Sequence, residues 1–148
     1  MAVSEQYLRV AFAGQEFLLP SSASYALEQR ESLSVNNSGA GNAAAWWETR
    51  GNRLAAYHLD SDLNPVRDDN WQRAVFLNAQ PHPIGLAAND IQLLPRAEVR
   101  VESFHALGPA STRGGQLFSG AWVQGSEVML VFEPHALATY LLTLKEGA

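Results

Sequence analysis

Short runs of alternating apolar and polar residues, each closed by turn-forming residues, constrain the fold of this 148-residue chain more than any other feature. Near the start, Leu8, Val10 and Phe12 recur at every second position before Gly14. Successive side chains of a β-strand point to opposite faces, so a period of two indicates half-buried strands. Turn signals about every 8–12 residues are typical of a barrel or sandwich, and we therefore expect an all-β protein.

Four hairpins are predicted where two such runs flank a short turn. They join residues 7–13 to 17–19, 45–50 to 53–59, 71–79 to 84–94, and 117–123 to 127–132. In the third pair the turn contains Pro81 and Pro83, which cannot donate ladder hydrogen bonds. We expect another short strand at 97–101, an irregular or one-turn helical link at 21–33, and a polar, exposed segment at 61–70. Glycine, asparagine and serine predict loops at 36–42 and 108–116.

One helix is predicted at the end of the chain. Pro134 suits the first helical position, where a missing backbone N–H costs nothing. The helical period places one group of apolar residues on a single face, namely Leu137, Tyr140, Leu141 and Leu144. About nine or ten short strands without βαβ alternation disfavour the nucleotide-binding α/β folds and leave two small barrels or one sandwich.

Composition excludes several classes of protein. The chain has no cysteine, which removes disulfides and thiolate metal sites. Its net charge is -5 with only 10 lysines and arginines, so we expect no nucleic-acid partner. No apolar run approaches the ~20 residues of a membrane-spanning helix, and the polar opening does not resemble a secretion signal. We expect a cytoplasmic protein without membrane insertion, forming a single domain over residues 1–148.

Four segments carry a resemblance to a known family. They are the opening strand Tyr7-Leu8-Arg9-Val10 with its return to Leu19, Arg50-Gly51 with the strand that ends at Leu59, Gly85-Leu86 with the apolar Ile91, and Leu117-Phe118-Ser119-Gly120 with the last hairpin and helix. In order and spacing, over most of residues 7–144, they resemble the CheW family, the coupling proteins of bacterial chemosensory arrays. The sequence departs from the family pattern at Ala55, usually proline, and at His58 and Asn89, usually aspartate.

The resemblance implies a fold of two intertwined five-stranded β-barrels with a short C-terminal helix. It also implies a non-enzymatic adaptor that couples chemoreceptors to a histidine kinase in a chemotaxis, pilus or surface-motility system. The implied partners are a kinase of the CheA type, the cytoplasmic tip of a chemoreceptor, and other CheW-like domains. No catalytic residue, metal or cofactor is expected. In this family the arginine that corresponds to Arg50 is associated with contacts to receptor or kinase.

Residue types near Arg50 also predict a protein-binding site there, independently of the resemblance. Trp46 and Trp47 are adjacent on a predicted strand, so they face opposite sides and only one of them is expected to enter the core. Tryptophan and arginine dominate binding hot spots, and Gly51 allows a turn that holds the guanidinium of Arg50 at the edge. The alternative is that a double barrel covers both faces of this strand and packs both indoles.

Two other classes of function stay open. A small-ligand module would stack Trp46, Trp71 and Trp122 against a sugar or another planar molecule. A hydrolase would need His58 and Asp60 in one concave pocket with perturbed proton affinities. The histidines are scattered over separate predicted elements, without the spacing that would place two of them on one metal; they are His58, His82, His105 and His135.

Overall fold

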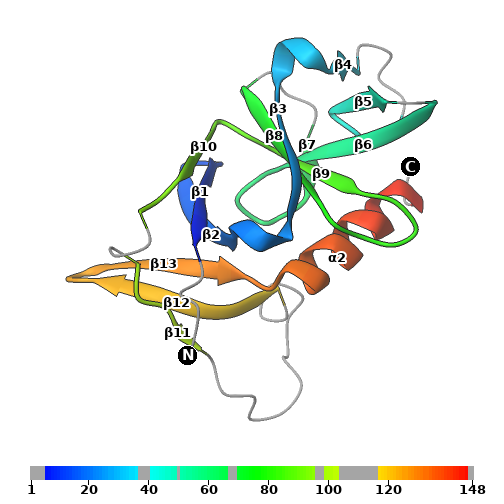
Figure 1. Ribbon diagram of the computed structural model, residues 1–148. Coiled ribbons are helices and arrows are strands. Elements are labelled where there is room, and N and C mark those ends of the chain that lie inside the picture. The colour runs from blue at the N-terminus through cyan, green and yellow to red at the C-terminus, as the bar shows by residue number, and fades with distance from the viewer. Residues whose placement is uncertain are drawn as a thin grey trace.

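Two curled β-sheets and one C-terminal helix make up the protein in the computed structural model, which describes residues 6–36, 41–49, 51–66, 70–95, 99–103 and 117–146 (Figure 1). The first sheet has the order β10 (Asp90–Leu93), β1 (Tyr7–Phe12), β2 (Gln15–Pro20), β13 (Glu127–Phe132), β12 (Phe118–Gln124) and β11 (Glu102–Ser103). The second has the order β3 (Ser24–Gln29), β8 (Arg73–Leu77), β9 (Ile84–Ala88), β6 (Asn52–Leu59), β5 (Ala45–Thr49) and β4 (Ser34–Val35), and β7 (Pro65–Val66) pairs with β6. The helix is α2 (Pro134–Glu146), and two single 3₁₀ turns, η1 (Ser21–Ala23) and η2 (Arg30–Ser32), flank β3.

Each sheet has five principal strands within the described residues. The strands β4, β7 and β11 are two residues long, and the remaining strands divide equally between the two sheets. The chain starts in the first sheet, forms the second with β3 to β9, and returns to the first with β10. The expected all-β fold of two intertwined five-stranded units with a C-terminal helix is thus confirmed.

Three hydrophobic clusters hold the sheets together. The largest lies between the two sheets and α2, and it includes Val10, Leu59, Leu86 and Leu141, each 0% exposed. The second is enclosed by the second sheet around Phe76 and Trp71, and the third lies against the first sheet around Leu18. A chain of this size can therefore bury apolar residues on both faces of its central strands, which raises the free energy of unfolding.

Strand β9 shows the consequence of two covered faces. All five of its residues are buried, with Leu86 in the cluster between the sheets and Ala87 in the cluster of the second sheet. Gly85 lies where a side chain would clash, because an added Cβ would stand 2.8 Å from Cε1 of Phe76 and 2.9 Å from Cβ of Ala56. Glycine at this position lets the second sheet close tightly.

The predicted hairpins are largely confirmed by the strand pairing. β1 pairs with β2, β5 with β6, β8 with β9, and β12 with β13, all antiparallel. The predicted helix is confirmed as well, and its apolar face, Leu137, Tyr140, Leu141 and Leu144, is buried. Its far end is tied down by Asn42, whose side-chain amide donates to the carbonyl of Leu144 at 2.9 Å.

The predicted single strand over residues 84–94 is wrong. The chain breaks at the exposed Asn89, and β10 leaves the second sheet to pair with β1 of the first, with Ile91 opposite Val10. The backbone N–H of Asn89 donates to the carbonyl of Ala11 at 2.8 Å and fixes the crossing. A run of apolar residues looks the same whether it stays in one sheet or passes between two.

The predicted link over residues 21–33 is confirmed only in part: it contains the single 3₁₀ turns η1 and η2, but the strand β3, which was not predicted, lies between them and pairs with β8. Tyr25, Leu27 and Gln29 are exposed while the residues between them are half-buried, which is the alternation of a strand. Alanine, leucine, glutamate and glutamine favour helices, but pairing along β8 overrides this local preference.

The remaining expectations concern loops. The polar segment 61–70 contains the short strand β7, and residues 67–69 lie outside the described part of the chain. The strand expected at 97–101 does not appear at 99–101, and residues 96–98 are not described; β11 follows at Glu102–Ser103. The predicted loop 108–116 and the centre of the loop 36–42, residues 37–40, also lie outside the described residues.

Candidate functional site

The β5–β6 hairpin carries a cluster of aromatic and charged side chains at the free end of the second sheet (Figure 1). The guanidinium of Arg53 lies over the ring of Trp46, with 4.0 Å from its Cζ to the ring centroid. The same guanidinium is 3.7 Å from a carboxylate oxygen of Glu48, directly across the hairpin, and both side chains are more than half exposed. An indole, a cation and a carboxylate are thus held together at a solvent-facing edge.

The other face of β5 carries Trp47, which packs inward. Its ring centroid is 5.0 Å from that of the buried Phe76 and 6.1 Å from that of Tyr25, which is 54% exposed. The two tryptophans face opposite sides, as predicted, and each is half-buried. The expectation that only one of them enters the core is wrong, because Trp46 packs against the cluster between the sheets and Trp47 against the cluster of the second sheet.

The turn of this hairpin has the geometry expected of its glycine. Gly51 has a φ of +83°, a backbone conformation that other residues adopt only with strain. Gly51, Glu48, Thr49, Asn52 and Arg53 line a shallow hollow of about 350 Å³ beside the turn. Arg50, the predicted contact residue, lies outside the described residues, so its role stays a prediction.

Arg53 and Glu48 are the residues of this cluster that were not predicted from the sequence. Arg53 stands opposite Glu48 in the hairpin register, and Trp46 is the diagonal neighbour on the same strand face as Glu48. Diagonal neighbours lie within reach of long and aromatic side chains. The predicted hairpin, with strands 45–50 and 53–59, would place Arg53 opposite Arg50. The observed turn lies one residue earlier, because Thr49 pairs with Asn52, and this register places Arg53 opposite Glu48.

The three tryptophans of the ligand-binding alternative do not form a stacking platform. Trp46 packs against the cluster between the sheets, Trp71 is 0% exposed within the second sheet, and Trp122 is 9% exposed against the first. Trp71 is covered further by Arg30, whose Cζ lies 4.6 Å from the ring centroid. A planar ligand would find no two of these rings together, so the module proposed from them loses its structural basis.

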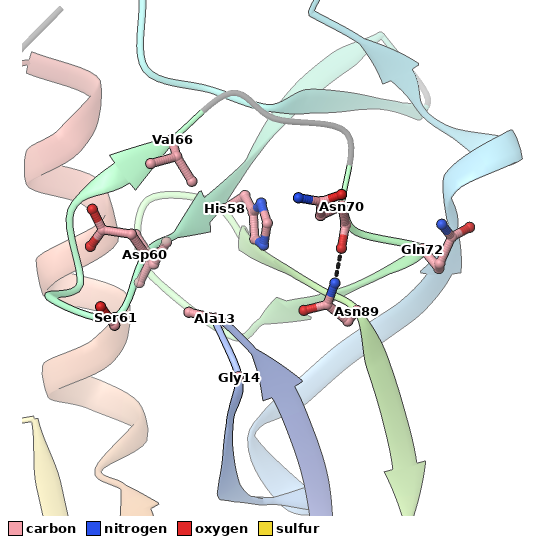
Figure 2. Close-up of a pocket in the computed structure, with 10 residues that line it drawn as sticks. Ala13, Gly14, His58, Asp60, Ser61, Val66, Asn70, Gln72 and Asn89 are labelled. Atoms are coloured by element: carbon pink, nitrogen blue, oxygen red, sulfur yellow. Dashed lines mark hydrogen bonds between the residues drawn. The ribbon is translucent and has the colours of Figure 1, made fainter.

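A cavity of about 660 Å³ lies where the β1–β2 turn meets the end of β6 (Figure 2). His58, which is 3% exposed, turns its ring toward this space, and Asn70, Gln72 and Asn89 also line the cavity. The side-chain amide of Asn89 donates to the backbone carbonyl of Asn70. The lining comes from segments distant in the sequence and is mostly polar and uncharged.

Asp60 belongs to the same cavity but does not orient His58. One carboxylate oxygen of Asp60 accepts the backbone N–H groups of Asp62 and Asn64, at 2.8 and 3.0 Å, and so closes the loop after β6. In Figure 2 this carboxylate points away from the imidazole. A hydrolase needs a base held by a third group beside a nucleophile. Since the carboxylate of Asp60 does not face the imidazole of His58, this pair does not have the geometry that the hydrolase hypothesis requires.

Over residues 6–36, 41–49, 51–66, 70–95, 99–103 and 117–146, no group of three histidine, aspartate or glutamate side chains comes together in a way that could hold a metal ion. His58 lies on β6, His82 between β8 and β9, and His135 on α2, while His105 is not described. Among the same residues, no helix is long and apolar enough to cross a membrane.

Comparison with known proteins points to one fold. No protein-family model matches the sequence, and no curated protein matches it. Among solved structures, the chain is similar to the scaffolding protein TtCheW from Thermoanaerobacter tengcongensis, with a TM-score of 0.64 and 12% sequence identity. The match covers 91% of this chain and 92% of that one. The two curled sheets and the C-terminal helix therefore form a CheW-like fold.

Proposed function

We propose that this chain is a non-enzymatic signalling adaptor, which couples chemoreceptors to a histidine kinase in a chemotaxis, pilus or surface-motility system. The observation that carries the proposal is the fold: nine-tenths of the chain superposes on a scaffolding protein of the CheW type. The four sequence segments that resemble the CheW family support the proposal independently of the structural comparison. The hydrolase hypothesis loses its pair of residues, because the carboxylate of Asp60 closes its own loop and points away from His58.

The proposed partners are a kinase of the CheA type, the cytoplasmic tip of a chemoreceptor, and other CheW-like domains. We place the first contact at the free end of the β5–β6 hairpin, around Arg50, Gly51, Trp46 and Trp47. Arg53 supports this choice, because its guanidinium is held by Trp46 and Glu48 yet stays more than half exposed. A planar, oriented guanidinium can bind a partner carboxylate with two hydrogen bonds.

The adaptor acts by geometry alone in this proposal. Two partners bind separate surfaces of one domain, residues 1–148, and their relative orientation is fixed by the rigid sheets between them. Each interface would bury about 800 Å² per partner, or less for a transient contact. Binding of this kind needs no cofactor, and the proposed compartment is the cytoplasm, where the kinase and the receptor tips lie.

A pull-down from the native cytoplasm tests the proposal, using wild-type protein and the Arg50→Ala variant. The matched control is Arg100→Ala, which removes an exposed arginine beside β11 in the first sheet. Circular dichroism verifies that all three proteins fold. The proposal expects wild type and Arg100→Ala to capture a chemosensory kinase or receptor, and Arg50→Ala to lose it.

The other outcomes are informative as well. Equal capture by Arg50→Ala would show that the contact lies elsewhere on the molecule. If none of the proteins captures a signalling component, the likeness to the scaffolding protein is one of fold without shared function.

A further inference from the structure

The end of the β12–β13 hairpin, residues 123–128, is exposed to solvent. Val123 and Val128 stand directly opposite each other in the register and are 53% and 59% exposed. Gly125, with a φ of +60°, begins the two-residue turn beyond them. In Figure 1 this hairpin projects past the edge of the neighbouring strands β1 and β2. Single exposed apolar residues are ordinary, but a facing pair at a projecting end is a surface that the chain itself leaves open.

The opposite face of the hairpin borders a cavity of about 510 Å³. Trp122 and Met129 pair across the hairpin and form its apolar wall, and Glu127 with Gln124 pair one step nearer the turn. Gly14 and Glu16, from the β1–β2 hairpin, line the facing side. Two carboxylates therefore flank an aromatic and a thioether side chain in one open hollow.

The charge balance of this hollow is negative. Glu16 shares Arg9 with Asp90, at 3.8 and 3.9 Å, and Arg9 also donates to the side chain of Gln92. Within the described residues no lysine or arginine lies at ion-pair distance from Glu127. Among the described residues the hollow thus has more carboxylates than cations, and this excess of negative charge favours a basic group on a partner.

We propose that the end of the β12–β13 hairpin docks a partner protein that presents a lysine or arginine beside an apolar surface. The basic side chain enters the hollow, lays its methylene stem on Trp122 and Met129, and meets the carboxylates of Glu127 and Glu16. The apolar surface covers Val123 and Val128. This surface lies in the first sheet, so it is distinct from the β5–β6 edge and does not depend on what binds there.

The test is a titration of the intact, isotope-labelled protein followed by NMR. The probe is a short synthetic peptide that alternates arginine with valine; a matched peptide replaces each arginine with glutamate. We expect chemical-shift changes at the Trp122 indole and the Met129 methyl group with the basic peptide only. Raising the salt concentration should weaken them, because exposed charges are screened beyond roughly 10 Å at 0.1 M salt.

Two charge-reversal variants locate the effect. Glu127→Lys should lower the affinity for the basic peptide about tenfold, in line with the loss of one charge-assisted contact. Glu31→Lys changes the net charge by the same amount on an exposed turn of the second sheet and should leave the affinity within about twofold. Equal weakening by both variants would overturn the proposal in favour of unspecific attraction, and no weakening by Glu127→Lys would overturn it outright.

The valine pair is tested with the double variant Val123→Thr and Val128→Thr, which keeps the β-branched shape of both side chains. The double variant should lower the affinity for the arginine–valine peptide severalfold. The affinity for a peptide that alternates arginine with serine should stay the same, because only the valine peptide offers an apolar surface. If the two peptides respond alike, the valine pair takes no part in docking.

Discussion

The two projecting hairpins share a plan and differ in how they are covered. Each ends in a two-residue turn with a glycine at positive φ, Gly51 at +83° and Gly125 at +60°. In the β5–β6 hairpin the large tryptophans are packed by clusters on both faces. In the β12–β13 hairpin the smaller Val123 and Val128 remain more than half exposed.

The difference teaches that residue size alone does not locate a binding surface. Trp46 and Trp47 are predicted from the sequence as binding residues, because tryptophan is frequent in hot spots. In the structure both side chains are half-buried, so much of each ring contributes to the stability of the fold. What reaches solvent at that end is the guanidinium of Arg53, held over one of the rings. At the other end, ordinary valines and glutamates form the surface that no part of the described chain covers.

The largest expected effect separates the two hairpins by their packing. Trp47→Ala should lower the free energy of unfolding by about 2–4 kcal/mol, because it leaves a void beside Phe76. Val128→Ala should change it by less than about 0.5 kcal/mol, as is usual for an exposed site. Urea denaturation followed by circular dichroism measures both. Similar losses in the two variants would remove the contrast between a packed and an uncovered hairpin.

Tyr57 lies on β6, the strand that connects the exposed turn with the core, and it should make the stability of the protein depend on pH. Burial raises the pKa of Tyr57 above the ordinary 10.0, and the residue is 2% exposed. The folded state therefore favours the neutral phenol. The contribution of Tyr57 to the free energy of unfolding is complete below pH 10.0, and it is lost as the pH rises through the raised pKa of the folded state. Urea midpoints from pH 8 to 11 should fall for wild type and fall less for Tyr57→Phe. An identical alkaline decline in both proteins would assign the effect to other groups.

Replacing either turn glycine with alanine should lower the free energy of unfolding by the same amount, because the two hairpins differ in packing and not in their turns. At Gly51 and Gly125 an added Cβ would meet nothing within 4 Å, so the cost of alanine is backbone strain alone. We expect Gly51→Ala and Gly125→Ala each to lower the free energy of unfolding by about 1–2 kcal/mol. Thermal and urea unfolding measure the pair side by side. A much larger loss at one site would mean that its turn is held by contacts beyond the backbone.

The smallest effect concerns the exposed guanidinium. Arg53→Ala should lower the free energy of unfolding by about 0.5–1 kcal/mol, the range for a cation–π contact at an exposed site. Arg53→Lys should keep part of that energy but lose binding to a partner carboxylate, since lysine lacks the planar fork. Unfolding measurements and partner binding, taken together, distinguish the two roles. If Arg53→Lys binds the partner as wild type does, the guanidinium geometry is not what the partner recognises.

Local patterns predicted the local elements of this fold. The alternation of Leu8, Val10 and Phe12 and the apolar face of the last helix correspond to buried residues in the structure. The change of sheet at Asn89 was not predictable from one run of apolar residues, because pairing with β1 is a long-range contact. Strand β3 was missed for a similar reason, since its residues favour a helix until β8 pairs with them.

The candidate sites depended even more on tertiary structure. A hairpin at this place was predicted, but with its turn one residue too late, and the contact of Arg53 with Trp46 follows only from the observed register. The cavity of His58 joins the β1–β2 turn to Asn89, and the hollow beside Trp122 joins Glu16 to Glu127. Neither set is close in the sequence, so neither could be read from motif spacing.

One measurement tests the central claim most directly: sedimentation of the purified protein with the regulatory domain of a CheA-type kinase and a chemoreceptor cytoplasmic fragment from the same organism. The adaptor account predicts a ternary species that contains all three components, and it predicts that Arg50→Ala releases one partner while the other stays bound. Three components that sediment independently at concentrations of tens of micromolar, where transient adaptors of this interface size bind, would contradict it.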